Sequence, residues 1–424
     1  MPDFEITTLD SGLRVISEHV PAVRSVALGL WIDVGSRDEA PAEAGLTHFI
    51  EHLLFKGTER HSALDIAQIF DRLGGDINAF TSKDSTCVHT RVLDEQVETA
   101  LTVICDMLSA PAWAELEPER EVILEEIAMI EDDPSDLVHD LAARCVFGDH
   151  QLGRPIIGSA RTVASFDEAA ASSFHERRYG DASIVLAAAG NVDHEELVRH
   201  AEKQLALPQG KTAARTAPNG VQPSHAFFVK ETEQVNVSLG APGLARRDDR
   251  RFALALLDSV LGSSASSRLM QEIRERRGMA YSVYSYTSQF SDAGQVGVAF
   301  GTRAENVEAC LTITRNQIDD LAKHGPTPEE LVRAKDSLKG RLLLSLESTG
   351  SRMSRLGRST LSGDEILSLD EVARRVDGVV HDDVVELAAT LYAADRMSVA
   401  AIGSDASVLE RALGRPVEHV AAVL

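Results

Sequence analysis

The sequence repeats one unit of about 210 residues, and this duplication limits its possible folds more than any other feature. Three landmarks recur in the second half in the same order: the segment HFIEHLLF, a helix start with a proline, and an apolar strand ending at a glycine. Their separations are 207, 210 and 213 residues, from His48 to Ala255, from Pro118 to Pro328 and from Gly190 to Gly403. A repeat of this length is a domain, because solenoid repeats have periods of about 20–50 residues. The sequence therefore predicts two homologous domains.

The two halves meet in a segment that is typical of a linker. Residues 206–226, ALPQGKTAARTAPNGVQPSHA, are rich in Pro, Gly, Ala and Thr and have neither helical nor strand periodicity. We predict a first domain over 1–208, a linker over 209–224 and a homologous domain over 225–424. In each half, alternating strand patterns such as SVALGLWIDVGS and NVSLGAPG mix with helical segments. The predicted fold class is α+β, with an antiparallel-rich sheet covered by helices in each domain.

The charge of the chain excludes some classes of partner. Its 42 basic and 66 acidic residues give a formal net charge of −24. This excess argues against binding to nucleic-acid phosphates or to an anionic membrane surface. No apolar run approaches the roughly 18 residues that a membrane-spanning helix needs. We therefore expect no nucleic-acid partner and no membrane association.

The cysteines and the N-terminal segment indicate a cytoplasmic protein. Cys87, Cys105, Cys145 and Cys310 are scattered without a CxxC motif, which is typical of reduced thiols. The first residues, MPDFEITTLDSGLRVISEHVP, lack the basic start and the apolar stretch of a secretory signal. Their alternating pattern on both sides of Asp10-Ser11-Gly12 predicts a β-hairpin instead.

The segment GLTHFIEHLLFKG places two histidines and a glutamate in an otherwise apolar helix. His48, Glu51 and His52 share one helix face, because positions i, i+3 and i+4 are neighbours. Two imidazoles one turn apart can bind one zinc ion, and Glu51 beside them suits a general base, as in the inverted zinc-peptidase motif H-x-x-E-H. The alternative is a helix with satisfied surface histidines. The second half has Ala255, Asp258 and Ser259 at the matching positions, so packing does not require the histidines.

A third metal ligand is predicted in the helical segment EPEREVILEEIAMIEDD, residues 117–133. Its apolar stripe, which includes Ile123, also contains Glu119 and Glu126. A buried carboxylate needs a cation or must become neutral, and a divalent metal supplies that cation. We expect Glu126 to be the ligand because it lies deeper in the stripe. Glu119 is either an acid that orients a ligand or the nucleophilic water, or an acid of the first helical turn stabilised by the helix dipole after Pro118.

Together these motifs resemble the M16 metallopeptidases, which include mitochondrial processing peptidase, its bacterial relatives, pitrilysin and the insulin-degrading enzymes. The resemblance rests on HFIEH, 73 intervening residues, and EREVILEE from Glu119 to Glu126, and it extends over essentially the whole chain. It implies one zinc ion per chain, with His48, His52 and Glu126 as ligands. It also implies that Glu51 is the catalytic base and that Glu119 is an assisting carboxylate.

Two further segments gain a role from this resemblance. The segment EIRERRGMAYSVYS contains Arg274 and Tyr281, which match the family residues that contact the substrate backbone and the tetrahedral oxyanion. By residue pattern alone, the same segment is an amphipathic helix with surface arginines followed by an aromatic strand. The segment GGDINAFTSKDSTCVHT predicts a strand over 77–82, which the resemblance places at a sheet edge. There it would pair with an extended substrate, although an ordinary edge strand fits the pattern too. The implied substrate-binding residues of this strand are Asn78, Ala79, Phe80 and Thr81.

The expected function is that of a zinc endopeptidase acting on peptides or unfolded polypeptides. The larger relatives enclose peptides in a chamber of four half-units, so a chain with two of them is expected to form a homodimer. Arg274 and Tyr281 are then expected to reach the partner's zinc. An acidic chamber would suit basic peptides. The alternative is a catalytically silent scaffold, as in core subunits of some respiratory complexes that share this fold and usually lack parts of the metal site.

Overall fold

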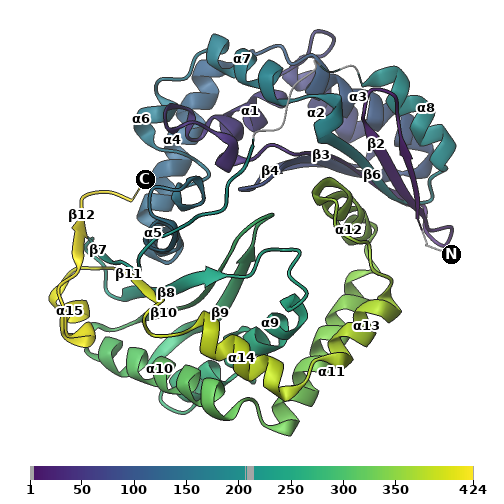
Figure 1. Cartoon of the computed structure of the whole chain (residues 1–424). Coiled ribbons are helices and arrows are strands. Elements are labelled where there is room, and N and C mark those ends of the chain that lie inside the picture. Colours follow the sequence, from purple (N-terminus) through teal and green to yellow (C-terminus); the bar gives the residue numbers. More distant parts are fainter. Residues whose placement is uncertain (1–3, 206, 208–213, 424) are drawn as a thin grey trace. The chain divides into compact units, whose positions relative to one another are not determined.

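The computed structural model describes residues 4–205, 207 and 214–423, and it contains two six-stranded sheets, each covered by helices (Figure 1). The first sheet has the order β1-β2-β6-β3-β5-β4. Its strands are β1 (Glu5–Thr8), β2 (Arg14–His19), β3 (Ser25–Ile32), β4 (Asp76–Thr81), β5 (Thr86–Leu93) and β6 (Ile184–Gly190). The second sheet has the order β12-β7-β11-β8-β10-β9. Its strands are β7 (His225–Val229), β8 (Val235–Gly243), β9 (Ala280–Gln289), β10 (Gly294–Thr302), β11 (Ser398–Gly403) and β12 (Glu418–Val420).

The two sheets confirm the predicted duplication and the α+β class. From the second strand of each order to the last, the pairing is the same: β2 and β6 are parallel, as are β7 and β11, and the following pairs are antiparallel. The sheets differ in their first strand, since β1 pairs antiparallel with β2, whereas β12 pairs parallel with β7. The β1–β2 pair is the hairpin predicted from the N-terminal segment. Both sheets are antiparallel-rich, as predicted.

The chain divides into two compact units. Unit 1 consists of residues 1–127, 155–215 and 342–368, and unit 2 of residues 128–154, 216–341 and 369–424. The helices with most of their residues in unit 1 are α1 (Leu46–Leu54), α2 (Ala63–Leu73), α3 (Val97–Ser109), α4 (Leu116–Asp132), α6 (Ala160–Val163), α7 (Glu168–Arg178), α8 (His194–Gln204) and α12 (Thr349–Ser362). The helices with most of their residues in unit 2 are α5 (Pro134–Phe147), α9 (Arg251–Asp258), α10 (Val307–His324), α11 (Pro328–Ser345), α13 (Leu369–Gly378), α14 (His381–Leu391) and α15 (Ser407–Leu413).

These units differ from a simple division of the chain at the linker. Each sheet has one face covered by helices of its own half and a second apolar face covered by a helix from the other half. In unit 1 this helix is α12 (Figure 1). Its Met353 and Leu356 pack on Trp31 and Ala187 of the sheet. In unit 2 it is α5, which packs on β8 and β11. The domain boundaries predicted at 208 and 225 miss this exchange because the sequence pattern of a helix does not say which sheet it covers.

The linker and the cysteines agree in part with the sequence analysis. Residues 214–224 form no helix or strand, and residues 209–213 of the predicted linker lie outside the described part of the chain. All four cysteines are buried and unpaired. Among the described residues, no helix is both long enough and apolar enough to cross a membrane.

Candidate metal centre

Helix α1 carries the HFIEH segment and begins at a fixed turn. Gly45 precedes the helix with φ +94°, and a Cβ there would lie 2.5 Å from the carbonyl oxygen of Ile157. A side chain at this position would therefore be strained and would clash with the backbone. The buried carboxylate of Glu39 accepts hydrogen bonds from the backbone N–H groups of Gly45 and Thr47, at 2.9 and 2.7 Å. Glu39 thus caps the helix, a role that no local pattern signals because it lies outside the helix.

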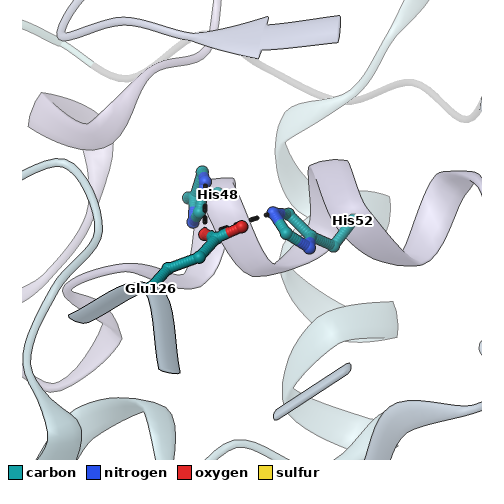
Figure 2. A group of neighbouring side chains, drawn as sticks. All are labelled: His48, His52 and Glu126. Atoms are coloured by element: carbon teal, nitrogen blue, oxygen red, sulfur yellow. Dashed lines mark ion pairs between the residues drawn. The ribbon is translucent and has the colours of Figure 1, made fainter. Parts of the chain in front are cut away.

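Three side chains from α1 and α4 converge on one point (Figure 2). Glu126 Oε2 lies 3.9 Å from His48 Nε2 and 3.7 Å from His52 Nε2. The candidate ligand atoms of the three residues all lie within 4.8 Å of one another. Two imidazole nitrogens and a carboxylate oxygen are typical zinc ligands, and two bonds of about 2.0–2.2 Å can span the distances of 3.7 and 3.9 Å from Glu126 to the two histidines. The structure therefore brings together the three predicted ligands in an arrangement that is compatible with zinc.

The surroundings of both histidines suit metal binding. Burial, with a smaller contribution from the neighbouring His52, lowers the pKa of His48 to about 4, so His48 is neutral near pH 7. Its Nδ1 is buried and has no hydrogen-bond partner in the described structure. Nδ1 of His52 lies 3.2 Å from Glu119 Oε2. Because an ionised carboxylate can only accept, this nitrogen donates to Glu119, and Nε2 is the ring nitrogen that faces Glu126.

Glu119 is the buried carboxylate of this centre, and the expectation that Glu126 lies deeper is wrong. The side chain of Glu119 is 7% exposed and that of Glu126 is 38% exposed. Glu119 Oε1 lies 2.7 Å from Nζ of Lys56, so its charge is compensated where it is buried. The apolar stripe of α4 is also narrower than predicted, since Ile123 is buried but Val122 is 44% exposed. The helix thus buries Glu119, Ile123 and Ile127 and leaves Glu126 partly exposed, where an ion could be reached.

Lys56 was not identified in the sequence analysis. It lies two residues beyond the end of α1 and links Glu119 to the same segment that holds His52. The available signal was its spacing, because a residue four positions after His52 faces the same side. The contact of Lys56 with Glu119, and that of Glu119 with His52, hold the imidazole of His52 in a defined orientation.

Glu51 lies beside the three ligands and points to the edge strand. Its side chain is buried, and its Oε2 accepts a hydrogen bond of 2.5 Å from Thr81 Oγ1 of β4. Burial raises the pKa of Glu51, and the hydrogen bond from Thr81 opposes this shift in part. The second half keeps this link without the histidines, because Asp258 at the matching position accepts a hydrogen bond of 2.6 Å from Ser285 of β9. A carboxylate that ties the helix to the edge strand is therefore common to both halves.

The predicted substrate strand is the outermost strand of the first sheet. Strand β4 pairs on one side only, with β5. Successive side chains alternate between the faces of the sheet, so Ala79 shares the face of Thr81, and Asn78 shares that of Phe80. Asn78 Oδ1 accepts a hydrogen bond of 2.8 Å from the N–H of Ala79. The ring of Phe80 is 37% exposed and lies edge-on to Trp31, with 5.6 Å between ring centroids.

Arg274 and Tyr281 lie together in unit 2. Arg274 lies in the last turn of the helical segment Met270–Glu275, and Tyr281 is the second residue of β9. The guanidinium carbon of Arg274 lies 4.7 Å from the centroid of the Tyr281 ring, and Tyr281 is 80% exposed. Both side chains can therefore reach a ligand outside their own unit's core.

Comparison with known proteins identifies the family of the two halves. Residues 14–160 match the profile of "Insulinase (Peptidase family M16)", and residues 165–338 match that of "Peptidase M16 inactive domain". A protein of Streptomyces coelicolor named as an uncharacterized zinc protease is 46% identical over 394 residues, which cover 89% of this chain and 85% of that protein. A Bacillus subtilis protein, also named as an uncharacterized zinc protease, is 40% identical over 92% of this chain and 95% of that protein.

Solved structures show the same fold. A peptidase M16 inactive domain from Pseudomonas fluorescens superposes with a TM-score of 0.88, at 22% identity, over 98% of this chain and 99% of that chain. A protease from Helicobacter pylori gives a TM-score of 0.87, also at 22% identity, over 95% of this chain and 100% of that chain. At this identity, the two structures support the fold alone.

Proposed function

The chain belongs to peptidase family M16, and on this basis we propose that it is a zinc-dependent endopeptidase acting on extended polypeptides. The observation that carries the proposal is the convergence of His48, His52 and Glu126 beside a buried carboxylate, Glu51. The matching positions of the second half show that packing does not require this set. The fold can form without this group of residues, and the group combines candidate metal ligands with a candidate base. A catalytic role therefore explains it best.

The roles of the residues follow from their positions. His48, His52 and Glu126 would hold a zinc ion, which would supply Lewis acidity to polarise a carbonyl and to lower the pKa of water. Glu51 accepts the proton of the attacking water and delivers it to the leaving amine, and its raised pKa favours this proton transfer near neutral pH. Thr81 holds one oxygen of Glu51 and leaves the other for the reaction. Glu119 fixes the imidazole of His52.

The substrate would bind as an added strand on the free edge of β4. The backbone N–H and C=O groups on this edge can pair with an extended peptide, and such pairing makes few demands on sequence. Thr81 on β4 holds the base, so a peptide on this edge would lie close to Glu51. Arg274 and Tyr281 would act on the substrate backbone and the oxyanion, since a guanidinium and a phenol are suitable donors to a developing negative oxygen.

The proposal is tested with the zinc-loaded full chain and a diverse peptide library. We expect new peptide termini, and we expect their formation to stop when a chelator removes the metal and to resume when zinc is restored. A protein that binds zinc but cleaves no member of the library would instead support the scaffold alternative. A protein that binds no zinc would contradict both the metal centre and the peptidase.

Lys56 is expected to position Glu119 and, through it, His52. Replacing Lys56 with Met removes the positive charge that faces a buried carboxylate, so Glu119 would no longer hold His52 in one orientation. We expect zinc affinity to fall by about 10- to 100-fold, the usual effect of losing a partner of a metal ligand. The measurement is zinc competition with a chromophoric chelator, and the matched control is Lys56→Arg, which keeps the charge. An unchanged affinity in Lys56→Met would remove Lys56 from the metal centre.

We also propose that the active form is a homodimer in which Arg274 and Tyr281 act on the partner's zinc site. Each chain carries both the proposed metal ligands and the Arg–Tyr pair, and Tyr281 is exposed. Two inactive variants, Glu51→Gln and Tyr281→Phe, are mixed under conditions that exchange subunits. A mixed dimer would then contain one complete site, so we expect activity to return to a sizeable fraction of wild type. Absence of recovery in verified mixed dimers would reject sharing between subunits.

A further inference from the structure

Helix α12 packs mainly on β2, β6 and β3 of the first sheet. Strands β5 and β4 follow β3 in the order of this sheet. A cavity of about 640 Å³ lies there, between Phe80 and His89 of the two outer strands and the first turns of α12. All its lining residues belong to unit 1. The cavity is therefore on the face of β4 opposite to Thr81 and Glu51.

The charge of this cavity differs from that of the chain as a whole. Its charged side chains are Arg355 and Arg358, and of the described residues that line it none carries a carboxylate. Burial lowers the pKa of His89, so its imidazole is neutral near pH 7. The guanidinium carbon of Arg358 lies 5.8 Å from the Trp31 ring centroid. The charged side chains that line the cavity are thus basic, in a protein of net charge −24.

The structure fixes Arg355 at the wall of the cavity. Its Nη1 donates a hydrogen bond of 2.9 Å to the carbonyl oxygen of Leu367, and its Nη2 lies 3.7 Å from Glu18. Glu18 also pairs with Arg352, so one carboxylate faces two arginines. Serine hydroxyls of α12, at Ser351 and Ser354, add neutral hydrogen-bond donors to the lining.

A peptide that adds to β4 as a further strand would bring some of its side chains to this cavity. A peptide paired with the free edge of β4 would alternate its side chains between the same two faces as β4 itself. Side chains on the face of Thr81 would point to the metal centre, and those on the face of Phe80 would point to the cavity. Phe80 is partly exposed at this edge, so it offers an apolar surface for the stem of such a side chain.

We propose that this cavity is a subsite for an acidic side chain of the bound polypeptide. The carboxylate would face Arg358 and Arg355, and its aliphatic stem would lie against Phe80 and Met353. Guanidinium groups suit this ligand because they bind carboxylates through charge-assisted hydrogen bonds. The proposal rests on the proposed function for the strand-like binding of the substrate. It predicts that the protein prefers acidic residues at alternate positions of the bound peptide, which the negative net charge of the protein would not suggest.

The test separates binding from cleavage. Zinc-loaded Glu51→Gln protein is titrated with fluorescent peptides that are otherwise neutral and that carry a single Glu or Gln at one of six consecutive positions. The kcat/KM of the wild-type protein is measured on the same set of peptides. We expect Glu to be favoured over Gln by about tenfold at every second position and by less than twofold between them, since one charge-assisted contact contributes roughly this factor. The preference should weaken with added salt.

Variants assign the preference to the cavity. Arg358→Gln should reduce the Glu/Gln ratio to below about threefold, and Arg358→Glu should favour Lys over Gln at the same positions. Arg199→Gln is the matched control, because Arg199 is an exposed arginine of α8, which packs on β2 at the other side of the sheet. It should keep the wild-type ratio. Zinc content and thermal unfolding are measured for each variant to verify folding.

The outcomes distinguish the two proposals. Equal binding of Glu and Gln peptides at all positions, or an unchanged ratio in Arg358→Gln, would overturn the subsite even if wild type cleaves peptides. An alternating preference in binding that disappears in Arg358→Gln would support the subsite even if wild type cleaves nothing. In that case, only the proposed peptidase activity would be rejected.

Discussion

Replacing Glu51 with Gln is expected to reduce kcat/KM for peptide hydrolysis by about 10³-fold while the protein keeps its zinc. Gln has nearly the same shape, and its carbonyl oxygen can still accept the hydrogen bond from Thr81, so the helix and β4 should remain linked. What is lost is a group that can take a proton. General-base catalysis typically contributes a factor of about 10² to 10⁴, which sets the size of the effect.

The measurement for Glu51→Gln combines steady-state cleavage of a fluorogenic peptide with zinc content by mass spectrometry. Glu125→Gln is the matched control, because Glu125 is exposed on the other face of α4, next to the ligand Glu126. The control should keep near wild-type activity. If Glu51→Gln retained more than a tenth of wild-type kcat/KM with full zinc, the assignment of the base would be wrong.

Removing a metal ligand is expected to have the second large effect, on zinc affinity as well as on activity. His52→Ala deletes one of the three proposed ligands and leaves Glu119 paired with Lys56 alone. We expect zinc affinity to fall by at least ~10³-fold, which exceeds the roughly 10- to 100-fold expected for an outer partner such as Lys56. Hydrolysis should fall below detection at zinc concentrations that saturate wild type.

Chelator competition measures this loss directly and does not depend on activity. His200→Ala is the control, because His200 lies on α8, where it pairs with Glu98 at 3.7 Å, and belongs to no metal cluster of the described residues. Wild-type zinc affinity in His52→Ala would contradict the ligand set. The loss of zinc affinity should be largest in His52→Ala, smaller in Lys56→Met and smallest in His200→Ala. This order tests the proposed arrangement of the metal centre.

Much of the candidate site follows from local sequence patterns. His48, Glu51 and His52 share a face because helix geometry fixes which positions are neighbours, and this needs no tertiary information. The duplication supplied a comparison within one chain, since Ala255 and Ser259 replace both histidines. The third ligand was predicted as Glu126 from an acid in an apolar stripe, and the structure brings it to both imidazoles.

The relative burial of the two acids on α4 could not be predicted in this way. A helical wheel places Glu119 and Glu126 on one stripe but does not say which turns of the helix are covered. The structure buries Glu119 because Lys56 and His52 meet it there, and it leaves Glu126 at the rim. Glu39, which caps α1 from outside the helix, was missed for the same reason.

The sequence by itself determined the repeated α+β unit and the residue types of the metal centre, because both depend on periodicity over short segments. Only the tertiary structure decided that α12 covers the first sheet and α5 the second. The same is true of the cavity beside β4, which joins strands near residue 80 to a helix near residue 355. Such contacts depend on which apolar faces meet over long separations in the chain, and a single sequence carries no local signal of that choice.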